Sequence, residues 1–158
     1  MSSETWDGRP SLWKGLAAGV VAGLVATAAK SIAEKLYPPR VHGEPEPPEL
    51  LSERVAGHPL DGRTEANASE AIHWSFGAAA GAFYGALAEF YPAATSKEGA
   101  SFGLALMALT HQQALPAPEL SAPPEEQSER EKTSEAATHI LYGIVAERVR
   151  GIVRGLLD

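Results

Sequence analysis

The chain has 158 residues, a formal net charge of -7 at pH 7 and no cysteine. This length suits one domain or about four membrane crossings. The acidic charge and the lack of a Lys/Arg-rich run argue against nucleic-acid binding, and the absence of cysteine excludes disulfides and thiolate chemistry. We therefore expect a single domain, residues 1–158, that has no nucleic-acid partner.

Four apolar stretches follow one another along the chain: 15–29, 71–88, 99–118 and 136–146. A helix that crosses a bilayer needs about 20 residues, with about 17 as the short limit. The second and third stretches meet this length directly. The first does so if its flanking lysines reach outward, and the fourth only if it continues through Glu147. No stretch alternates with the period of a strand. The predicted fold class is all-α, a membrane bundle of four transmembrane helices at about 11–37, 68–91, 97–115 and 129–156.

Proline and capping signals set these boundaries. Asn67–Glu70 and Ser128–Glu131 both fit a capping box, and the prolines at 38–39, 92 and 116 end the preceding helices. The connecting loops 38–67 and 116–128 are acidic and proline-rich. Segments 69–77 and 134–143 resemble each other, which suggests two repeated helical hairpins.

Glycine spacing favours lipid as the surroundings of these helices. Glycines recur every fourth residue and form grooves typical of helix packing in membranes, as in a glycine zipper, whereas each interior glycine costs about 1 kcal/mol in a soluble helix. The packing positions expected are Gly15, Gly19, Gly23, Gly77, Gly81, Gly85, Gly99 and Gly103, and Gly151 and Gly155 repeat the step. Such grooves also suit self-association or a membrane-protein partner.

Charge asymmetry predicts the orientation. The stretches 37–70 and 116–135, which contain the two acidic loops, each carry about -4, while the opposite side holds Lys97 and the arginines near both ends of the chain. Because cationic residues stay on the cytoplasmic side, we expect a multi-pass protein of the bacterial cytoplasmic (inner) membrane with both termini cytoplasmic. A cleaved signal peptide is the competing interpretation of 15–29, but the acidic leader argues against it.

This topology brings ionisable residues from all four helices to the outer side. They form a predicted polar intramembrane cluster of Lys30, Glu34, Glu70, His73, His111, Glu135 and His139. Ionisable groups at membrane depth usually face the bundle interior or a water-filled cavity, and histidine is the side chain most easily charged by mild acid. Glu70, His73, Glu135 and His139 would titrate, with the others completing the cluster. The alternative is a structural role, in which these groups only cap helices and bridge them.

Catalysis and cofactor binding are not expected. The chain has no hydrolase elbow, phosphate-binding loop, dinucleotide fingerprint or zinc-protease helix. Glu70 and His73 have the spacing of di-iron bundles, but the second pair, Glu135 and His139, is one residue longer and the third helix lacks a mid-helix glutamate. We therefore predict no enzyme activity, no metal site and no cofactor.

The residues also resemble a known family. The run from Leu16 through Lys30, Glu34 and Pro38-Pro39-Arg40, then His73 to Pro116, and finally Ser134 to Arg150 is similar to the YagU-like bacterial inner-membrane proteins. The likeness covers about residues 12–40 and 69–154. It implies a multi-pass membrane protein without catalytic residues and with a link to acid tolerance.

Two functions remain open at this point. The first is a membrane protein whose His/Glu layer near the outer face responds to protons or small ions. The alternative is a structural or accessory subunit of a membrane complex that has no transport activity.

Overall fold

The structure is all-helical over the part of the chain that it describes. It is a computed structural model and describes residues 10–40, 45–116 and 119–158. Parts of the expected domain and of both acidic loops (1–9, 41–44 and 117–118) lie outside these ranges. Its longest elements are α1 (Leu12–Leu36), α3 (Gly62–Phe90) and α5 (Glu129–Leu156), with the shorter α2 (Pro47–Ala56) and α4 (Ala100–Leu109).

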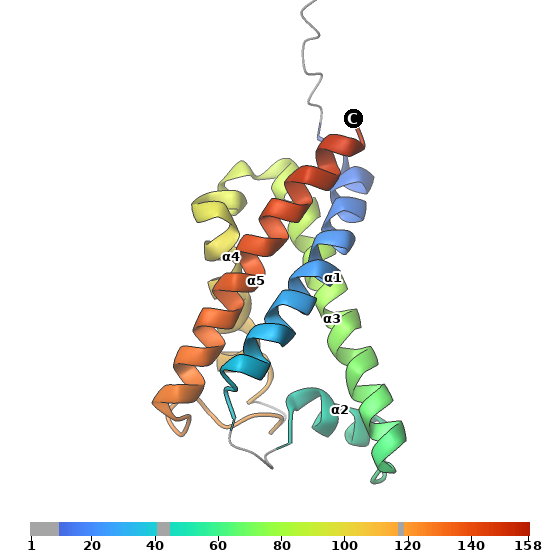
Figure 1. The fold of residues 1–158 in the computed structure, drawn as a ribbon, viewed down its shortest axis with the longest axis vertical. Helices are drawn as coiled ribbons and strands as arrows, with labels where there is room; N and C mark the ends of the chain where they lie inside the picture. The colour runs from blue at the N-terminus through green and yellow to red at the C-terminus, as the bar shows by residue number, and fades with distance from the viewer. Residues whose placement is uncertain (1–9, 41–44, 117–118) are drawn as a thin grey trace, which may run out of the picture.

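The helices α1, α3, α4 and α5 run alternately down and up through the molecule (Figure 1). The start of α1 and the end of α5 therefore lie at the same end, where Lys14 Nζ is 2.9 Å from Asp158 Oδ1. The opposite end carries α2 and the segment that leads into α5. Two chemically different ends result from this alternation.

Glycines allow α1 and α3 to cross at backbone contact distance. A Cβ added to Gly19 would overlap the carbonyl oxygen of Gly81, and one added to Gly81 would overlap that of Gly19. A Cβ on Gly23 would overlap the carbonyl oxygen of Gly77 and one on Gly85 that of Gly15, while one on Gly77 would overlap the side chain of Thr27. All six glycines of the two predicted grooves thus face each other within one chain, so that this groove is already occupied.

A second glycine crossing joins α4 to α5. A Cβ on Gly99 would overlap the carbonyl oxygen of Gly143, and one on Gly103 that of His139. Gly143 was not among the expected packing positions. Gly151 and Gly155, by contrast, have open space where a Cβ would stand.

The first acidic loop is more ordered than the sequence analysis expected. Residues 47–56 form α2, which begins with two prolines and a reciprocal capping box between Glu46 and Glu49. Proline is favoured in the first helical turn because the backbone amides there have no acceptor within the helix, so that its missing N–H loses no hydrogen bond. α3 also begins six residues before the expected 68, because Asp61 caps it by accepting from the amides of Arg63 and Thr64. The capping box expected at Asn67–Glu70 is therefore wrong, and these residues lie inside the helix.

The third helix differs from the expected 97–115 at both ends. Lys97, Glu98 and Gly99 have positive φ and belong to the turn η1 (Pro92–Gly99). At its far end α4 widens into one π-turn, η2 (Thr110–Ala114), closed by the Leu115 amide on the Thr110 carbonyl at 2.8 Å. The Thr110 hydroxyl donates to the Leu106 carbonyl (2.8 Å), a bond that often accompanies helix distortion.

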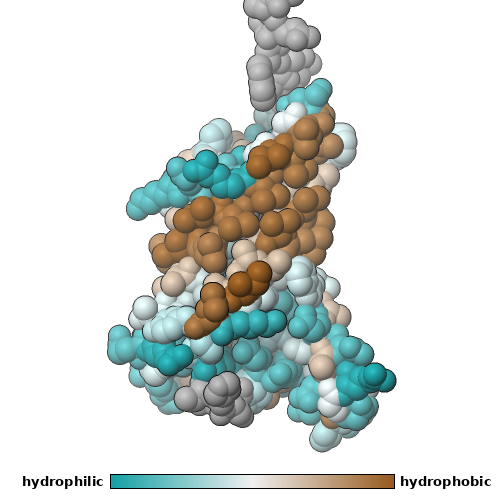
Figure 2. Space-filling view, in the orientation of Figure 1, coloured by the Kyte–Doolittle hydropathy of each residue, from teal (hydrophilic) through white to brown (hydrophobic). Residues whose placement is uncertain are grey.

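On α1 the large apolar side chains face outward and the small residues face inward. The buried residues of α1 are Gly15, Ala18, Gly19, Ala22, Gly23, Ala26 and Thr27, whereas Leu16, Val20, Val21, Leu24 and Val25 are exposed. Figure 2 shows the resulting apolar band across one face, with polar surface at the end that carries α2. Within the described residues, α1 is the one helix long and apolar enough to cross a membrane by length and composition. One such helix is a weak indication of membrane association.

Candidate functional site

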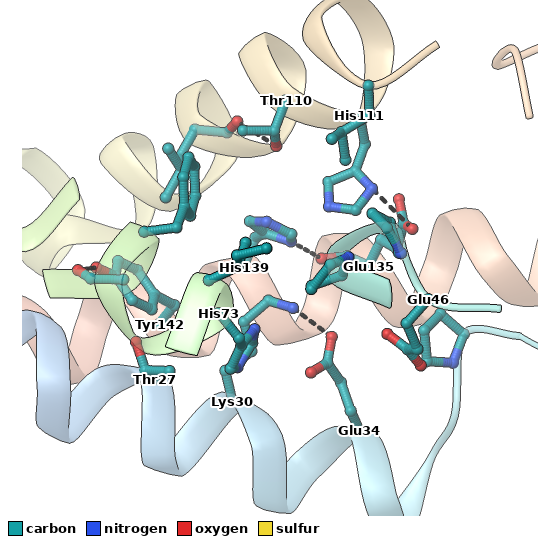
Figure 3. A pocket seen from close by; sticks show the side chains of 18 of the residues that line it. Thr27, Lys30, Glu34, Glu46, His73, Thr110, His111, Glu135, His139 and Tyr142 are labelled. Carbon is teal, nitrogen blue, oxygen red and sulfur yellow. Dashed lines mark hydrogen bonds and ion pairs between the residues drawn. The ribbon is translucent and has the colours of Figure 1, made fainter. Parts of the chain in front are cut away.

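A cavity of about 200 Å³ lies between the helices at the end of the molecule that carries α2. Its walls come from the last turns of α1, the middle of α3, the α4–η2 junction and the first half of α5, and α2 lies over one side. The charged and polar side chains that line it point toward a common space (Figure 3). Those labelled in Figure 3 are Thr27, Lys30, Glu34, Glu46, His73, Thr110, His111, Glu135, His139 and Tyr142, and Arg40 also lines the cavity.

Six of the seven residues of the predicted polar cluster line this cavity. The exception is Glu70, which is exposed and accepts a hydrogen bond from Trp74 Nε1 at 2.7 Å on the outer side of α3. The sequence analysis did not include Tyr142, although Glu135, His139 and Tyr142 share the i, i+4, i+7 face of one helix. It also could not place Glu46, because that residue comes from the segment interpreted as a loop.

In the cavity lining, His111 of η2 contacts Glu135 of α5. His111 Nδ1 lies 2.9 Å from Glu135 Oε1, and Glu135 is only 2% exposed. The distance between Nδ1 and Oε1 is within hydrogen-bonding range, but the angle at the donor is unfavourable, so that Nδ1 makes no hydrogen bond of normal geometry. Because two lone pairs this close would repel, the ring carries a hydrogen on Nδ1, which faces the carboxylate. The other oxygen of the carboxylate, Oε2, is buried and has no hydrogen-bond partner.

The π-turn places His111 against this carboxylate. His111 is the second residue of η2, at the point where α4 leaves regular α-helical geometry. Single π-turns inside α-helices occur frequently at functional sites. The turn thus links the local distortion of α4 to the position of the His111 ring.

The other two histidines are held by neutral groups. His139 Nδ1 lies 2.8 Å from the Glu135 backbone carbonyl, and since a carbonyl only accepts, Nδ1 carries the hydrogen. Its ring packs edge-on against that of His111, with centroids 4.9 Å apart. His73 Nε2 lies 3.0 Å from the Ser31 hydroxyl of α1. The His111 and His139 rings are thus in contact, His73 lines the same cavity, and of the three only His111 contacts a carboxylate.

Lys30 and Glu34 form an ion pair one turn apart on α1, at the mouth of the cavity. Tyr142 donates a 2.7 Å hydrogen bond to the Gly77 carbonyl of α3, which ties α5 to α3 at the inner end of the cavity. The lining thus contains the Lys30–Glu34 ion pair, the Tyr142–Gly77 hydrogen bond and one buried acceptor without a partner, Glu135 Oε2.

A second polar cluster lies at the opposite end and was not part of the predicted site. Tyr84 donates to Glu147 Oε2 at 2.7 Å, and Arg150 contacts both oxygens of the same carboxylate at 2.8 Å. Nearby, Glu89 pairs with Arg154 and accepts from the Ser11 amide. Both carboxylates have cationic and neutral donors, so this cluster fixes helix ends and has the character of a structural network.

The cavity combines a buried acid, a histidine and apolar walls, which suits the binding of a proton or a small cation. Within the residues that the structure describes, no group of three or more His, Asp or Glu side chains is arranged to hold a metal ion. The fold and the cavity together define a helical bundle with glycine-packed crossings around an internal polar site.

Comparison with known families places the chain more closely. It belongs to the family described as "Protein of unknown function (DUF1440)", whose model matches residues 24–148. This range contains all the residues that line the cavity. No curated protein and no solved structure matches the chain.

Proposed function

We propose that the protein is embedded in a membrane and that its cavity binds protons near one face of the bilayer. The observation that carries the first part is the inverted distribution of side chains on α1, where glycine and alanine are buried and leucine and valine are exposed. In water this arrangement would leave a large apolar patch uncovered, which soluble monomers rarely show. In lipid the exposed leucine and valine side chains contact acyl chains and carry no such penalty. Close packing through small residues then becomes the main source of helix association.

The proposed topology has four crossings. At about 1.5 Å per residue, α1, α3 and α5 exceed the roughly 30 Å of a bilayer core. The 15 residues of α4 and η2 together reach about 22 Å, so the third crossing is the short one and requires local thinning of the membrane. We place the protein in the bacterial cytoplasmic membrane with both termini inside, because the stretches 37–70 and 116–135 at the other end each carry a net charge of about -4.

The proton-binding site is the His111–Glu135 pair. A neutral His111 presents its Nδ1 hydrogen to Glu135 Oε1. One further proton, on Nε2, makes the ring cationic beside a buried negative charge. Burial strengthens the attraction between the two charges, so acid would stabilise the closed contact between α4 and α5. The charged and titratable groups that line the cavity with the pair are Lys30 and Glu34 from α1, Arg40 after α1, Glu46 from the start of α2, His73 from α3, and His139 and Tyr142 from α5.

This proposal agrees with the likeness to YagU-like inner-membrane proteins and extends to a role in acid tolerance. A pH-sensitive contact between two helices is a way for a membrane protein to respond to outside acid.

The titration can be measured directly. We expect ¹⁵N-histidine NMR of the full chain in nanodiscs to show the His111 ring becoming doubly protonated on mild acidification, with His139 unchanged over the same range. Glu135→Gln should move the His111 transition to lower pH, and Glu70→Gln should leave it in place. A His111 signal that does not respond to Glu135→Gln would contradict the proposal.

A second function is favoured by one observation. Gly151 and Gly155 on α5 face open space, unlike the eight predicted packing glycines. A structural or accessory subunit would use such a surface for a partner helix or a second copy. Crosslinking in native membranes distinguishes the two, since a stable hetero-complex with a pH-insensitive His111 would support the accessory role.

A further inference from the structure

We propose that the cavity binds a small protonated amine, with the ammonium group on Glu135 and a compact hydrocarbon part against the apolar walls. This inference rests on the proposed function, because it uses the same site, but it names a ligand class that proton binding does not require.

The first argument is the free oxygen of Glu135. Oε2 is buried and has no hydrogen-bond partner, and Glu135 is one of the residues that line the cavity. Leaving a buried acceptor without a donor is unfavourable, and more so for a charged group. The nearby ammonium of Lys30 does not supply the donor, because it pairs with Glu34. An N–H donor that enters the cavity with a positive charge would satisfy both the hydrogen-bond need and the charge of this carboxylate.

The second argument is the chemistry of the walls. The cavity is also lined by Ile72, Phe76, Leu106 and Leu115, and by Leu51 of α2. Ligand sites are mostly apolar, with a few polar groups that fix the orientation of the ligand. A bare metal ion would gain nothing from such walls, whereas the hydrocarbon part of an organic amine would bury its surface against them.

The third argument is competition with the proton. A protonated His111 neutralises Glu135 from the Oε1 side, so the carboxylate attracts a second cation less. The cationic and titratable neighbours named above, including Lys30, His73 and His139, add to this repulsion when they are charged. Acid should therefore release the amine, which couples the ligand to the proton through one shared carboxylate.

The test uses the full chain in lipid nanodiscs and three probes of the same shape. Benzylammonium carries the proposed charge, benzyl alcohol is neutral and benzoate is anionic. Isothermal titration calorimetry should show saturable binding of benzylammonium, with benzyl alcohol at least about tenfold weaker and benzoate absent. Glu135→Gln should weaken benzylammonium binding by about tenfold or more, while Glu70→Gln, which changes a carboxylate outside the cavity, should not.

A second measurement keeps the inference testable if Glu135→Gln fails to fold. In the unaltered protein, lowering the pH from about 8 to about 5 should weaken benzylammonium binding, and His111→Gln should remove most of this dependence. Equal binding of benzyl alcohol and benzylammonium, or benzylammonium binding unaffected by Glu135→Gln, overturns the inference. If no probe binds but His111 still titrates with Glu135, the proton site stands and only the amine site is lost. If amine binding persists without His111 titration, the proposed function fails instead.

Discussion

Single residues decide how the cavity end of the bundle is held together. Tyr142 is an example, since its side chain is buried and its hydroxyl donates to the backbone of another helix at Gly77. The Gly77 carbonyl already lies in the helical ladder of α3, so the bond joins α5 to α3 without opening either helix.

Replacing Tyr142 with phenylalanine removes this bond and keeps the ring. We expect the free energy of unfolding to fall by about 0.5–1.5 kcal/mol, the usual net value of one hydrogen bond. Unfolding in mixed micelles with rising dodecyl sulfate measures this change. Tyr91→Phe, at an exposed position after α3, is the matched control, and an equal loss in both variants would contradict the assignment.

Asp61 determines where α3 begins. Hydrogen bonds from the hydroxyl and the amide of Thr64 hold the pKa of the Asp61 carboxyl below its usual value. The stabilisation is therefore present above the ordinary carboxyl pKa and is lost as the pH falls through the lowered one.

Asp61→Ala should fray the first turn of α3, and Asp61→Ser should preserve it, because serine also caps helices. Faster hydrogen exchange of the Arg63 and Thr64 amides in the alanine variant alone is the expected result. In the unaltered protein the same amides should lose protection only at strongly acidic pH. Unchanged exchange in Asp61→Ala would show that another group starts the helix.

At the scale of the helices, the α1–α3 crossing depends on the absence of side chains. A Cβ on Gly19 or Gly81 meets the backbone of the opposite helix, which cannot move aside as a side chain can. The two helices must then separate, and the contacts along the whole crossing are lost.

Gly81→Val should destabilise the bundle by more than the roughly 1–3 kcal/mol typical of core overpacking. Gly151→Val introduces the same side chain into an interior helical position with open space and should have little effect. Resistance to dodecyl sulfate unfolding compares the two. If both variants resist equally, the crossing in the structure is wrong.

The sequence predicts these helices better than their connections. Prolines at 38–39 and 92 and the serine at 128 coincide with observed helix ends, because a missing amide or a capping oxygen acts locally. The α2 helix escaped prediction because ten residues with few apolar positions give no periodic signal. The π-turn at Thr110 also escaped, since nothing in the composition of residues 110–114 distinguishes it from the end of an α-helix.

The polar cavity, like the fold, could be predicted only in part. Residues near helix ends at one depth could be grouped from the sequence, and six of the seven expected residues line one cavity. Which side chains touch could not be read from the sequence, because contact depends on helix rotation. Glu70 and His73 are one turn apart, yet the first faces outward beside Trp74 and the second faces the cavity.

For the whole molecule, the arrangement of apolar surface is the central feature. Exposed large side chains occur on α1, on α3 at Phe76 and Phe83, and on α4 at Leu104. They surround the glycine crossings, while the charged cavity and the Glu147–Arg150 pair lie toward the two ends. The central claim is that lipid covers this surface.

The chain has no cysteine, so single introduced cysteines give a direct test without background labelling. Val21→Cys and Phe83→Cys lie at exposed apolar positions on the bundle, and Val55→Cys lies at an exposed apolar position on α2, beyond the crossings. With a membrane-impermeant maleimide applied to permeabilised native membranes, we predict labelling of Val55→Cys and protection of the other two until detergent is added. Equal labelling of all three before detergent would mean that water covers the apolar surface, and it would contradict the account.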